Sequence, residues 1–377
     1  MSAWPNKYVI GLTGNIATGK SVIRKMLEHL GAYGIDADAL AHRAIAPEAP
    51  GYRPVIETFG KWIVSADGQI ERTRLGKVVF ADAEALRQLE AIVHPLVRQA
   101  LDVMMRRATQ KVVVIEAIKL LEGPLRQACD TIWVTLTPAD LQLARLRQKR
   151  GMSEEEARQR IAAQTSQEAK RAAANVIIRN DGSFEETWRQ VAAAWQAVFP
   201  GVETGPVVIA PAAKGVLVVE RGRPRQAEEI AAFITRIGKG KVALSRADIM
   251  AAFGEKAFLL LRMDSRIVGL MGWQVENLVA RTADVYLEPG LALGEVMRLL
   301  LGEVERASRE LQCEALLLFL PPHLARQEAI WRELRYEPRT IETLGVRAWQ
   351  EAASESIFPG QAMLFKQLRK DRVLRPV

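Results

Sequence analysis

The first half of the chain alternates short, continuously apolar runs with longer segments in which apolar residues recur every three or four positions. Continuous apolar runs are typical of strands covered on both faces, and the longer period is typical of amphipathic helices. Their alternation predicts an α/β domain with a parallel sheet. The expected strands are 8–12, a short one leading into 35–38, 112–115, 131–135 and 176–178, and the expected helices are 21–30, 38–45, 83–107, 138–150, 153–163 and 184–198.

The pattern changes after Phe199, where residues 200–215 are rich in Pro, Gly and Ala. Such a composition is typical of an inter-domain linker. The remainder shows its own alternation, which predicts a second α/β domain and the division 1–199, 200–215 and 216–377. Its expected elements are a hairpin of 258–261 and 267–273 with its turn at Asp264-Ser265, strands 285–287 and 315–320, and a helix over 295–311.

A glycine-containing motif joins the first expected strand to the first expected helix. Residues 14–21 read Gly-Asn-Ile-Ala-Thr-Gly-Lys-Ser, which fits the phosphate-loop pattern G-x-x-x-x-G-K-[ST] in its proper context, so a plain glycine turn is disfavoured. The amides of such a loop hold nucleotide phosphates, Lys20 would reach the β- and γ-phosphates, and the Ser21 hydroxyl would lie on Mg²⁺. The sequence therefore predicts ATP and Mg²⁺ as ligands. The expected nucleotide-binding residues are Gly14, Asn15, Ile16, Ala17, Thr18, Gly19, Lys20, Ser21 and Val22.

Composition narrows the choice of partners. The 377 residues carry a net charge of +8, which suits polyanionic small molecules and also nucleic acid. However, there is no lysine-rich tail or zinc-finger spacing, and arginines are dispersed among acids, as in 145–156, so no nucleic-acid partner is expected. Cys129 and Cys313 stand in no metal-ligand spacing, which favours a reducing compartment, the cytoplasm. No apolar leader or stretch of about 20 apolar residues is found, and no membrane span is expected.

Two aspartates follow the second expected strand, in the sequence Asp36-Ala37-Asp38. Ligands of open α/β folds bind at this carboxyl edge of the sheet, where a carboxylate can accept the proton of an attacking hydroxyl during phosphoryl transfer. The alternative is that both aspartates cap the next helix. One of them can cap the helix while the other is catalytic.

Several motifs in order make the first half resemble the dephospho-coenzyme A kinase family over about residues 8–198. They are the phosphate loop, Asp36-Ala37-Asp38, the L-x-x-x-V-F pattern ending at Phe80, His94-Pro95, the segment 138–164, and Asn180-Asp181-Gly182.

The resemblance implies a fold and a reaction. The fold is a P-loop nucleotide-kinase-like parallel sheet with a helical lid over about 137–170. The reaction is ATP-dependent phosphorylation of the ribose 3′-hydroxyl of dephospho-CoA, the last step of coenzyme A biosynthesis. By the same resemblance Asp38 is the general base, Lys20, Arg145 and Arg150 serve the triphosphate, and Glu116 is a carboxylate near the metal, which Ser21 also binds.

The sequence departs from the family at three positions, Asn15, Ala17 and Lys119. Asn15 and Ala17 replace glycines of the loop, and both tolerate the expected backbone, since Asn accepts left-handed conformations and Ala adds only a methyl. Lys119 is foreign to the segment after 112–115 and could face a phosphate of the acceptor or cap the surface. His94 keeps the family motif and could contact substrate or be a packed histidine at a helix break.

The second domain resembles the GNAT N-acetyltransferase fold in its element order and in the segment 329–338. The acetyl-CoA loop of that family begins with Arg or Gln, and here residues 289–294 keep Gly290 and Gly294 without either. The resemblance therefore implies a degenerate domain used for packing or partner binding. CoA or acetyl-CoA is the possible alternative ligand.

Two further readings of the whole chain remain. The first is another P-loop kinase that acts on a small molecule or nucleoside. The second is a non-catalytic ATP-binding regulatory module with a CoA-sensing second domain. The two aspartates and the arginine-bearing lid argue against the second, since a sensor needs neither.

Overall fold

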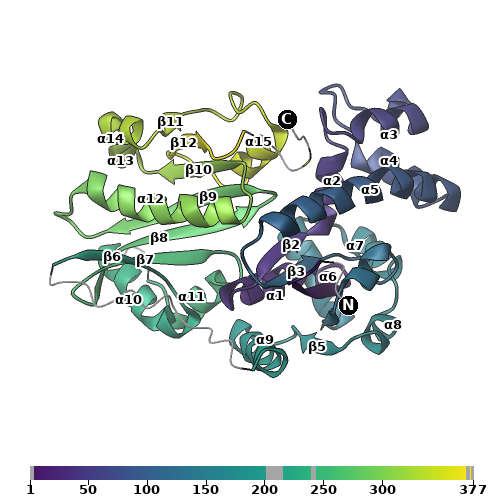
Figure 1. The fold of residues 1–377 in the computed structure, drawn as a ribbon, viewed down its shortest axis with the longest axis horizontal. Helices are drawn as coiled ribbons and strands as arrows, with labels where there is room; N and C mark the ends of the chain where they lie inside the picture. Colours follow the sequence, from purple (N-terminus) through teal and green to yellow (C-terminus); the bar gives the residue numbers. More distant parts are fainter. Residues whose placement is uncertain (1–3, 201–214, 239–242, 371–373, 375–377) are drawn as a thin grey trace.

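The computed structural model describes residues 4–200, 215–238, 243–370 and 374, apart from the side chains of 149, 150 and 283. The chain forms two α/β domains side by side, each built on one sheet (Figure 1). The first sheet has five parallel strands in the order β2-β3-β1-β4-β5, as expected for an α/β domain. Its strands are β1 (Tyr8–Gly14), β2 (Tyr33–Asp36), β3 (Val112–Glu116), β4 (Thr131–Leu136) and β5 (Val176–Arg179).

Helices cover both faces of this sheet, which explains the continuous apolar runs. Val9 and Val113 pack in one core with α2 and α5, whereas Ile10 and Val114 pack in another core with α1 and α9. Strand residues thus alternate between two buried faces. The helices are α1 (Lys20–His29), α2 (Ala37–Ala44), α3 (Tyr52–Phe59), α4 (Arg72–Val79), α5 (Ala83–Arg107), α6 (Ala139–Arg150), α7 (Glu154–Ala162), α8 (Gln167–Ala172) and α9 (Phe184–Val198), with 3₁₀ turns at Lys61–Ile63 and Pro124–Ala128.

His94 does not lie at a break in helix α5, contrary to one of the two expectations for this residue. The helix runs without interruption through Pro95, and His94 is exposed on it. The reading of His94 as a packed histidine at a helix break is therefore wrong. The first domain also contains α3, α4 and α8, which the hydrophobic pattern did not indicate because helices of six to eight residues span barely two turns.

The second domain contains a mixed seven-stranded sheet in the order β11-β12-β10-β9-β8-β7-β6. The expected turn at Asp264-Ser265 is present, and both residues have positive φ, 50° and 68°. The linker expected at 200–215 lies almost entirely outside the described residues, so its bounds stay a prediction. The elements are β6 (Leu217–Arg221), η3 (Pro224–Gln226), α10 (Ala227–Ile237), α11 (Arg246–Ala252), β7 (Ala257–Met263), β8 (Arg266–Glu276), β9 (Val279–Leu287), α12 (Leu293–Glu310), β10 (Ala315–Leu320), α13 (Pro322–Ala325), α14 (Glu328–Glu333), β11 (Glu337–Pro338), α15 (Arg347–Ser354) and β12 (Ala362–Gln367).

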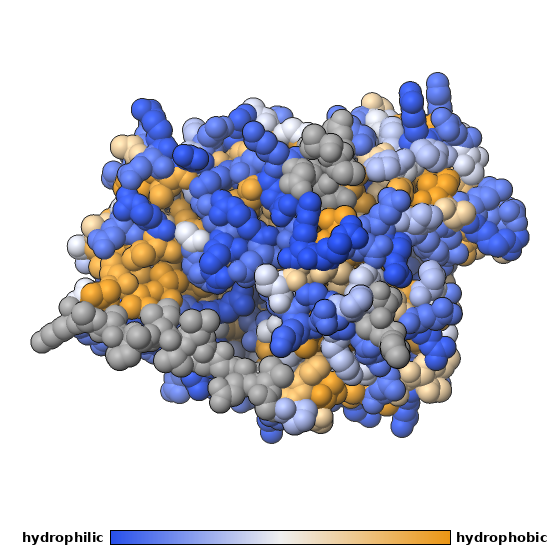
Figure 2. All heavy atoms as spheres, in the orientation of Figure 1, coloured by the Kyte–Doolittle hydropathy of each residue, from blue (hydrophilic) through white to orange (hydrophobic). Residues whose placement is uncertain are grey.

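Hydrophilic residues dominate the face of the molecule seen in Figure 2, with a hydrophobic area over part of the second domain. Within the residues that the structure describes, no helix combines the length and apolar character needed to cross a membrane.

The β8–β9 turn of the second domain enters the core of the first. Leu278, at the tip of this turn, is only 7% exposed and belongs to the hydrophobic cluster that contains Val9 and Tyr33. Leu278 adopts a left-handed conformation with φ of 61°, which costs free energy for a residue with a β-carbon. Burial in the neighbouring domain offsets this cost.

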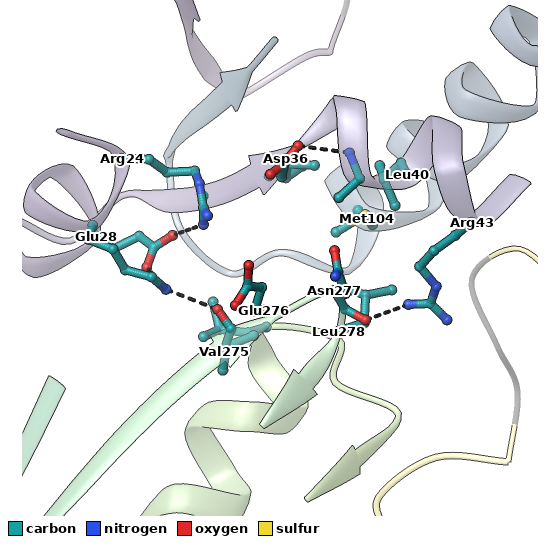
Figure 3. A pocket seen from close by; sticks show the side chains of 15 residues that line it. Arg24, Glu28, Asp36, Leu40, Arg43, Met104, Val275, Glu276, Asn277 and Leu278 are labelled. Carbon is teal, nitrogen blue, oxygen red and sulfur yellow. Dashed lines mark hydrogen bonds and ion pairs between the residues drawn. The ribbon is translucent and has the colours of Figure 1, made fainter. Parts of the chain in front are cut away.

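Polar contacts surround the inserted turn. Arg43 on α2 donates to the Asn277 carbonyl at 2.8 Å and pairs with Glu314 at 2.6 Å, and the Glu314 side chain is almost fully buried. On α1, Lys25 donates to the Val275 carbonyl at 3.1 Å. A cavity of about 50 Å³ remains between these groups, with Arg24, Glu28 and Asp36 on one wall (Figure 3). The second domain thus contacts α1, which follows the phosphate loop, and α2, which Asp36 caps and which contains Asp38.

We predict that Leu278→Ala lowers the free energy of unfolding by about 2–4 kcal/mol, because it removes buried apolar contacts that join two domains. Leu299→Ala on α12 is the matched control, since Leu299 is 36% exposed, and it should cost about 1 kcal/mol or less. Urea unfolding followed by circular dichroism measures both values. Equal losses for the two variants would show that the inserted turn contributes no more than a surface leucine.

His29 supplies a pH-dependent contact at the same interface. Its Nε2 lies 2.8 Å from the Phe253 carbonyl, and burial lowers its pKa to about 4 despite that hydrogen bond. Between pH 6.5 and 4 the unfolded chain therefore binds more protons at this residue than the folded chain, so stability falls as the pH is lowered through this window.

We predict that His29→Gln flattens this dependence by about 1–2 kcal/mol between pH 6.5 and 4, less than the full linkage value because the ring is only partly buried. Unfolding free energies of the two proteins across that pH range provide the measurement. If the difference in unfolding free energy between the two proteins stayed the same from pH 6.5 to pH 4, His29 would titrate normally in the folded protein.

Candidate active site

The phosphate loop has the tight backbone that its glycines permit. A β-carbon on Gly14 would lie 2.1 Å from the Thr135 hydroxyl oxygen, and one on Gly19, where φ is 91°, would lie 1.9 Å from the Asn180 side-chain nitrogen. Neither position can hold a larger residue. Ala17 has a left-handed φ of 59°, whereas Asn15 does not, so the left-handed conformation expected of Asn15 lies instead at Ala17.

The end of the loop brings together the two expected metal ligands. The Ser21 hydroxyl donates to Glu116 Oε1 at 2.9 Å, and Glu116 at the end of β3 is only 4% exposed. The Lys20 ammonium donates to the Asn15 carbonyl at 3.2 Å, so its side chain folds back over the loop. Lys20, Ser21 and Glu116, which the sequence analysis selected, thus lie together at the phosphate loop.

A buried arginine holds Glu116. Arg24 Nε donates to Glu116 Oε2 at 2.7 Å, and its Nη1 donates to Glu28 at 2.7 Å. Burial opposes ionisation of Arg24, but the carboxylates of Glu28, Glu116 and Asp36 outweigh this and raise its pKa. Arg24 therefore stays charged and fixes the position of Glu116. This arginine gave no signal in the sequence beyond its place on α1.

The two aspartates have different roles. Asp36 Oδ1 accepts a hydrogen bond from the Ala39 amide at 2.8 Å and caps α2. Burial and the nearby Glu116 carboxylate raise the pKa of Asp36 to about 6. Asp38, in the first turn of α2, instead accepts a hydrogen bond from the Ile118 amide at 3.0 Å. Asp36 is therefore the capping aspartate, and the catalytic role of Asp38 stays a prediction.

The environment of Asp38 suits a proton acceptor. Burial raises its pKa, and the Ile118 amide and the Lys20 ammonium counteract part of this shift. A carboxylate with a raised pKa accepts a proton more readily, which is what a general base needs. Asp38 stands beside the end of β3, on the same edge of the sheet as the phosphate loop.

Residues of the expected lid contact the phosphate loop. Arg145 on α6 donates to the Ala17 carbonyl at 3.1 Å and to the Asn180 carbonyl at 2.8 Å. The Ile16 amide donates to the Gln164 side chain at 2.8 Å, a contact that the sequence did not predict. The side chain of Arg150 lies outside the described part of the chain, so its expected role stays a prediction.

Lys119 lies at the surface beside the site. Its ammonium is 3.7 Å from Glu90, and both side chains are well exposed. This contact fits the surface reading of Lys119 and leaves its possible contact with the acceptor untested.

Nucleotide phosphates on this loop would lie near Lys20 and Arg145, with Asp38 at the edge of the sheet where an acceptor hydroxyl could approach. Proteins with this arrangement are P-loop phosphotransferases. The sequence model of the family described as dephospho-CoA kinase matches residues 8–186. A dephospho-CoA kinase of Geobacter sulfurreducens is 40% identical over 195 residues, which cover 51% of this chain and 99% of the relative. The chain belongs to the dephospho-CoA kinase family.

Solved structures align with each half. A dephospho-CoA kinase from Campylobacter jejuni is 28% identical with a TM-score of 0.39, covering 52% of this chain and 98% of that one. The second domain resembles an acetyltransferase of the GNAT family from Staphylococcus aureus, at 14% identity and a TM-score of 0.34, covering 41% of this chain and 100% of that one.

We predict that Arg24→Met lowers the free energy of unfolding by about 3 kcal/mol, because it leaves the Glu116 carboxylate buried without its partner. Arg87→Met is the control, since the Arg87–Glu84 pair is exposed on α5 and should contribute under about 1 kcal/mol. Chemical denaturation at neutral pH gives both values. A loss for Arg24→Met as small as that of the control would remove Arg24 from the support of Glu116.

Proposed function

We propose that the first domain transfers the γ-phosphoryl group of ATP to the ribose 3′-hydroxyl of dephospho-CoA and releases CoA and ADP. The observation that carries this proposal is the position of Asp38, which the Ile118 amide holds at the sheet edge next to the phosphate loop. Family membership supplies the acceptor, and the site geometry supplies the residues for each part of the reaction.

The 3′-oxygen of the ribose forms a bond to the γ-phosphorus, and Asp38 accepts the proton that this oxygen loses. The bond between the γ-phosphorus and the bridging oxygen of ADP breaks in the same step. Charge spreads over the phosphoryl oxygens during this step. Lys20 and Arg145 lie at the loop and stabilise that charge, and the Arg145 guanidinium already stands against Ala17 and Asn180. Arg150, at the end of α6, is proposed as a further arginine for the triphosphate.

The donor set at the end of the loop fits a magnesium ion. Mg²⁺ prefers oxygen ligands and is usually bound by one or two protein groups together with water and substrate phosphates. The Ser21 hydroxyl and the Glu116 carboxylate are such donors, 2.9 Å apart. When bound, the ion would neutralise charge on the β- and γ-phosphates. Among the described residues, no group of three or more His, Cys, Asp or Glu could hold a metal ion.

For the second domain we propose a degenerate fold used for packing or partner binding, without acetyl transfer, and CoA or acetyl-CoA is the alternative ligand. The loop before α12 contains Pro289, which lacks an amide hydrogen, and Glu288 stands directly before it. The Glu288 carboxylate is held by Arg236 and Arg266. A carboxylate at this point is unfavourable for a pyrophosphate.

We also place the protein in the cytoplasm, because Cys129 and Cys313 are both free thiols.

The function is tested by ADP release from the purified full chain with ATP and Mg²⁺. Dephospho-CoA should stimulate release, and mass spectrometry with phosphodiesterase digestion should place the new phosphate on the 3′-oxygen. Nucleosides and pantetheine serve as competing acceptors. Stimulation by a nucleoside alone would favour another small-molecule kinase, and ATP binding without any turnover would favour the regulatory module.

We predict that Asp38→Asn lowers kcat by about 10²–10⁴-fold, the usual effect of losing a general base, while ATP affinity is largely kept. Asp36→Asn is the matched control, because Asn also caps helices and Asp36 takes no proton in this scheme. Steady-state ADP release and calorimetric ATP binding provide the data. A larger loss of kcat for Asp36→Asn than for Asp38→Asn would reverse the assignment of the two aspartates.

A further inference from the structure

A second lysine is buried beside the site and takes no part in the scheme above. Lys170 lies on α8 (Gln167–Ala172), which packs against β1 and β4, and its side chain is only 1% exposed. In the sequence it looks like one charge of a solvated helix, Gln167-Glu168-Ala169-Lys170-Arg171. Lysine is among the residues least often buried without a partner, so its position requires an explanation.

The ammonium of Lys170 is hydrogen-bonded to the segment that holds Asp38. Its Nζ donates to the Ile118 carbonyl at 2.8 Å, and the amide of the same residue donates to Asp38 at 3.0 Å. Both contacts are made by the backbone of Ile118, so a single residue separates Lys170 from the proposed base. Burial lowers the pKa of Lys170, Glu122 and Asp38 oppose this shift, and the ammonium of Lys20 adds to it.

This ammonium has unused capacity. It carries three hydrogen-bond donors, of which the Ile118 carbonyl takes one, and no carboxylate of the described residues forms an ion pair with it. The Ile118 carbonyl also accepts a hydrogen bond from the Thr13 hydroxyl at 3.0 Å, so its position does not depend on Lys170 alone. A buried cation without a counter-ion is costly, and an anion in the site would remove that cost.

We propose that Lys170 is a further catalytic residue, whose ammonium contacts the oxygens of the phosphoryl group as it passes from ATP to the acceptor. This inference rests on the proposed function. The transferred group moves between the end of the phosphate loop, where Lys20 lies, and the hydroxyl that Asp38 deprotonates. Lys170 stands near both residues, and a fixed positive charge there is worth most when charge develops on the phosphoryl oxygens.

Two substitutions separate this role from simple support of Ile118. Lys170→Gln can still donate to the Ile118 carbonyl but lacks the charge, whereas Lys170→Arg keeps the charge. We expect Lys170→Gln to lower kcat about 10²-fold with the KM for ATP within about threefold of the parent, and Lys170→Arg to keep more than about a tenth of kcat. The control is Lys366→Met, which removes a mostly buried lysine bonded to the Leu334 carbonyl in the second domain and should leave kcat unchanged.

A binding measurement reads the contact directly. Calorimetry compares the binding of ADP with and without fluoroaluminate, which mimics the phosphoryl group during transfer. Mg²⁺ and dephospho-CoA are present in both measurements. The parent protein should bind ADP more tightly with fluoroaluminate, and Lys170→Gln should lose this gain while binding ADP alone normally. Full kcat in Lys170→Gln, or an unchanged fluoroaluminate gain, would overturn the proposal. If the parent protein itself fails to phosphorylate dephospho-CoA, the proposed function fails instead.

Discussion

The site depends on the register of three neighbouring parallel strands. Glu116, the last residue of β3, lies opposite Leu12 of β1 on one side and Asp36 of β2 on the other. Parallel strands end at one edge of a sheet, so this register places the phosphate loop, the buried carboxylate and the two aspartates level with one another. Glu116 then links the end of β3 to α1 by hydrogen bonds, since it accepts from both Ser21 and Arg24. Loss of this carboxylate would remove the side-chain link between α1 and the end of β3.

The sequence could predict the elements whose signal is local and strong. Helix α5 and strand β10 have the expected bounds because each has a long periodic or continuous apolar pattern. The residue pattern alone left the division of roles between Asp36 and Asp38 open, and only the family resemblance assigned the base to Asp38. This division depends on whether each carboxylate meets the amide of Ala39 or that of Ile118, which is 80 residues from Asp38.

The features that the sequence did not predict are those made by distant contacts. Gln164 and Lys170 stand in short polar helices or turns and look like surface residues, because nothing near them in the chain shows that they fold against the loop. The β8–β9 turn gave no signal because its residues, Asn277 and Leu278, resemble an ordinary hairpin tip. The pattern of apolar residues describes which positions are buried but not which domain buries them.

The insertion of Leu278 into the first domain has a consequence for biosynthesis. Ribosomes make the chain from its N-terminus, and all strands of the kinase sheet are complete by Arg179. About 100 further residues must be added before Leu278 can reach its place, which at 5–20 residues per second takes roughly 5–20 seconds. During that interval the nascent first domain exposes the apolar surface that the turn later covers. Chaperones that bind emerging chains would meet this surface. The first domain therefore covers this apolar surface only after the β8–β9 turn of the second domain has been synthesised.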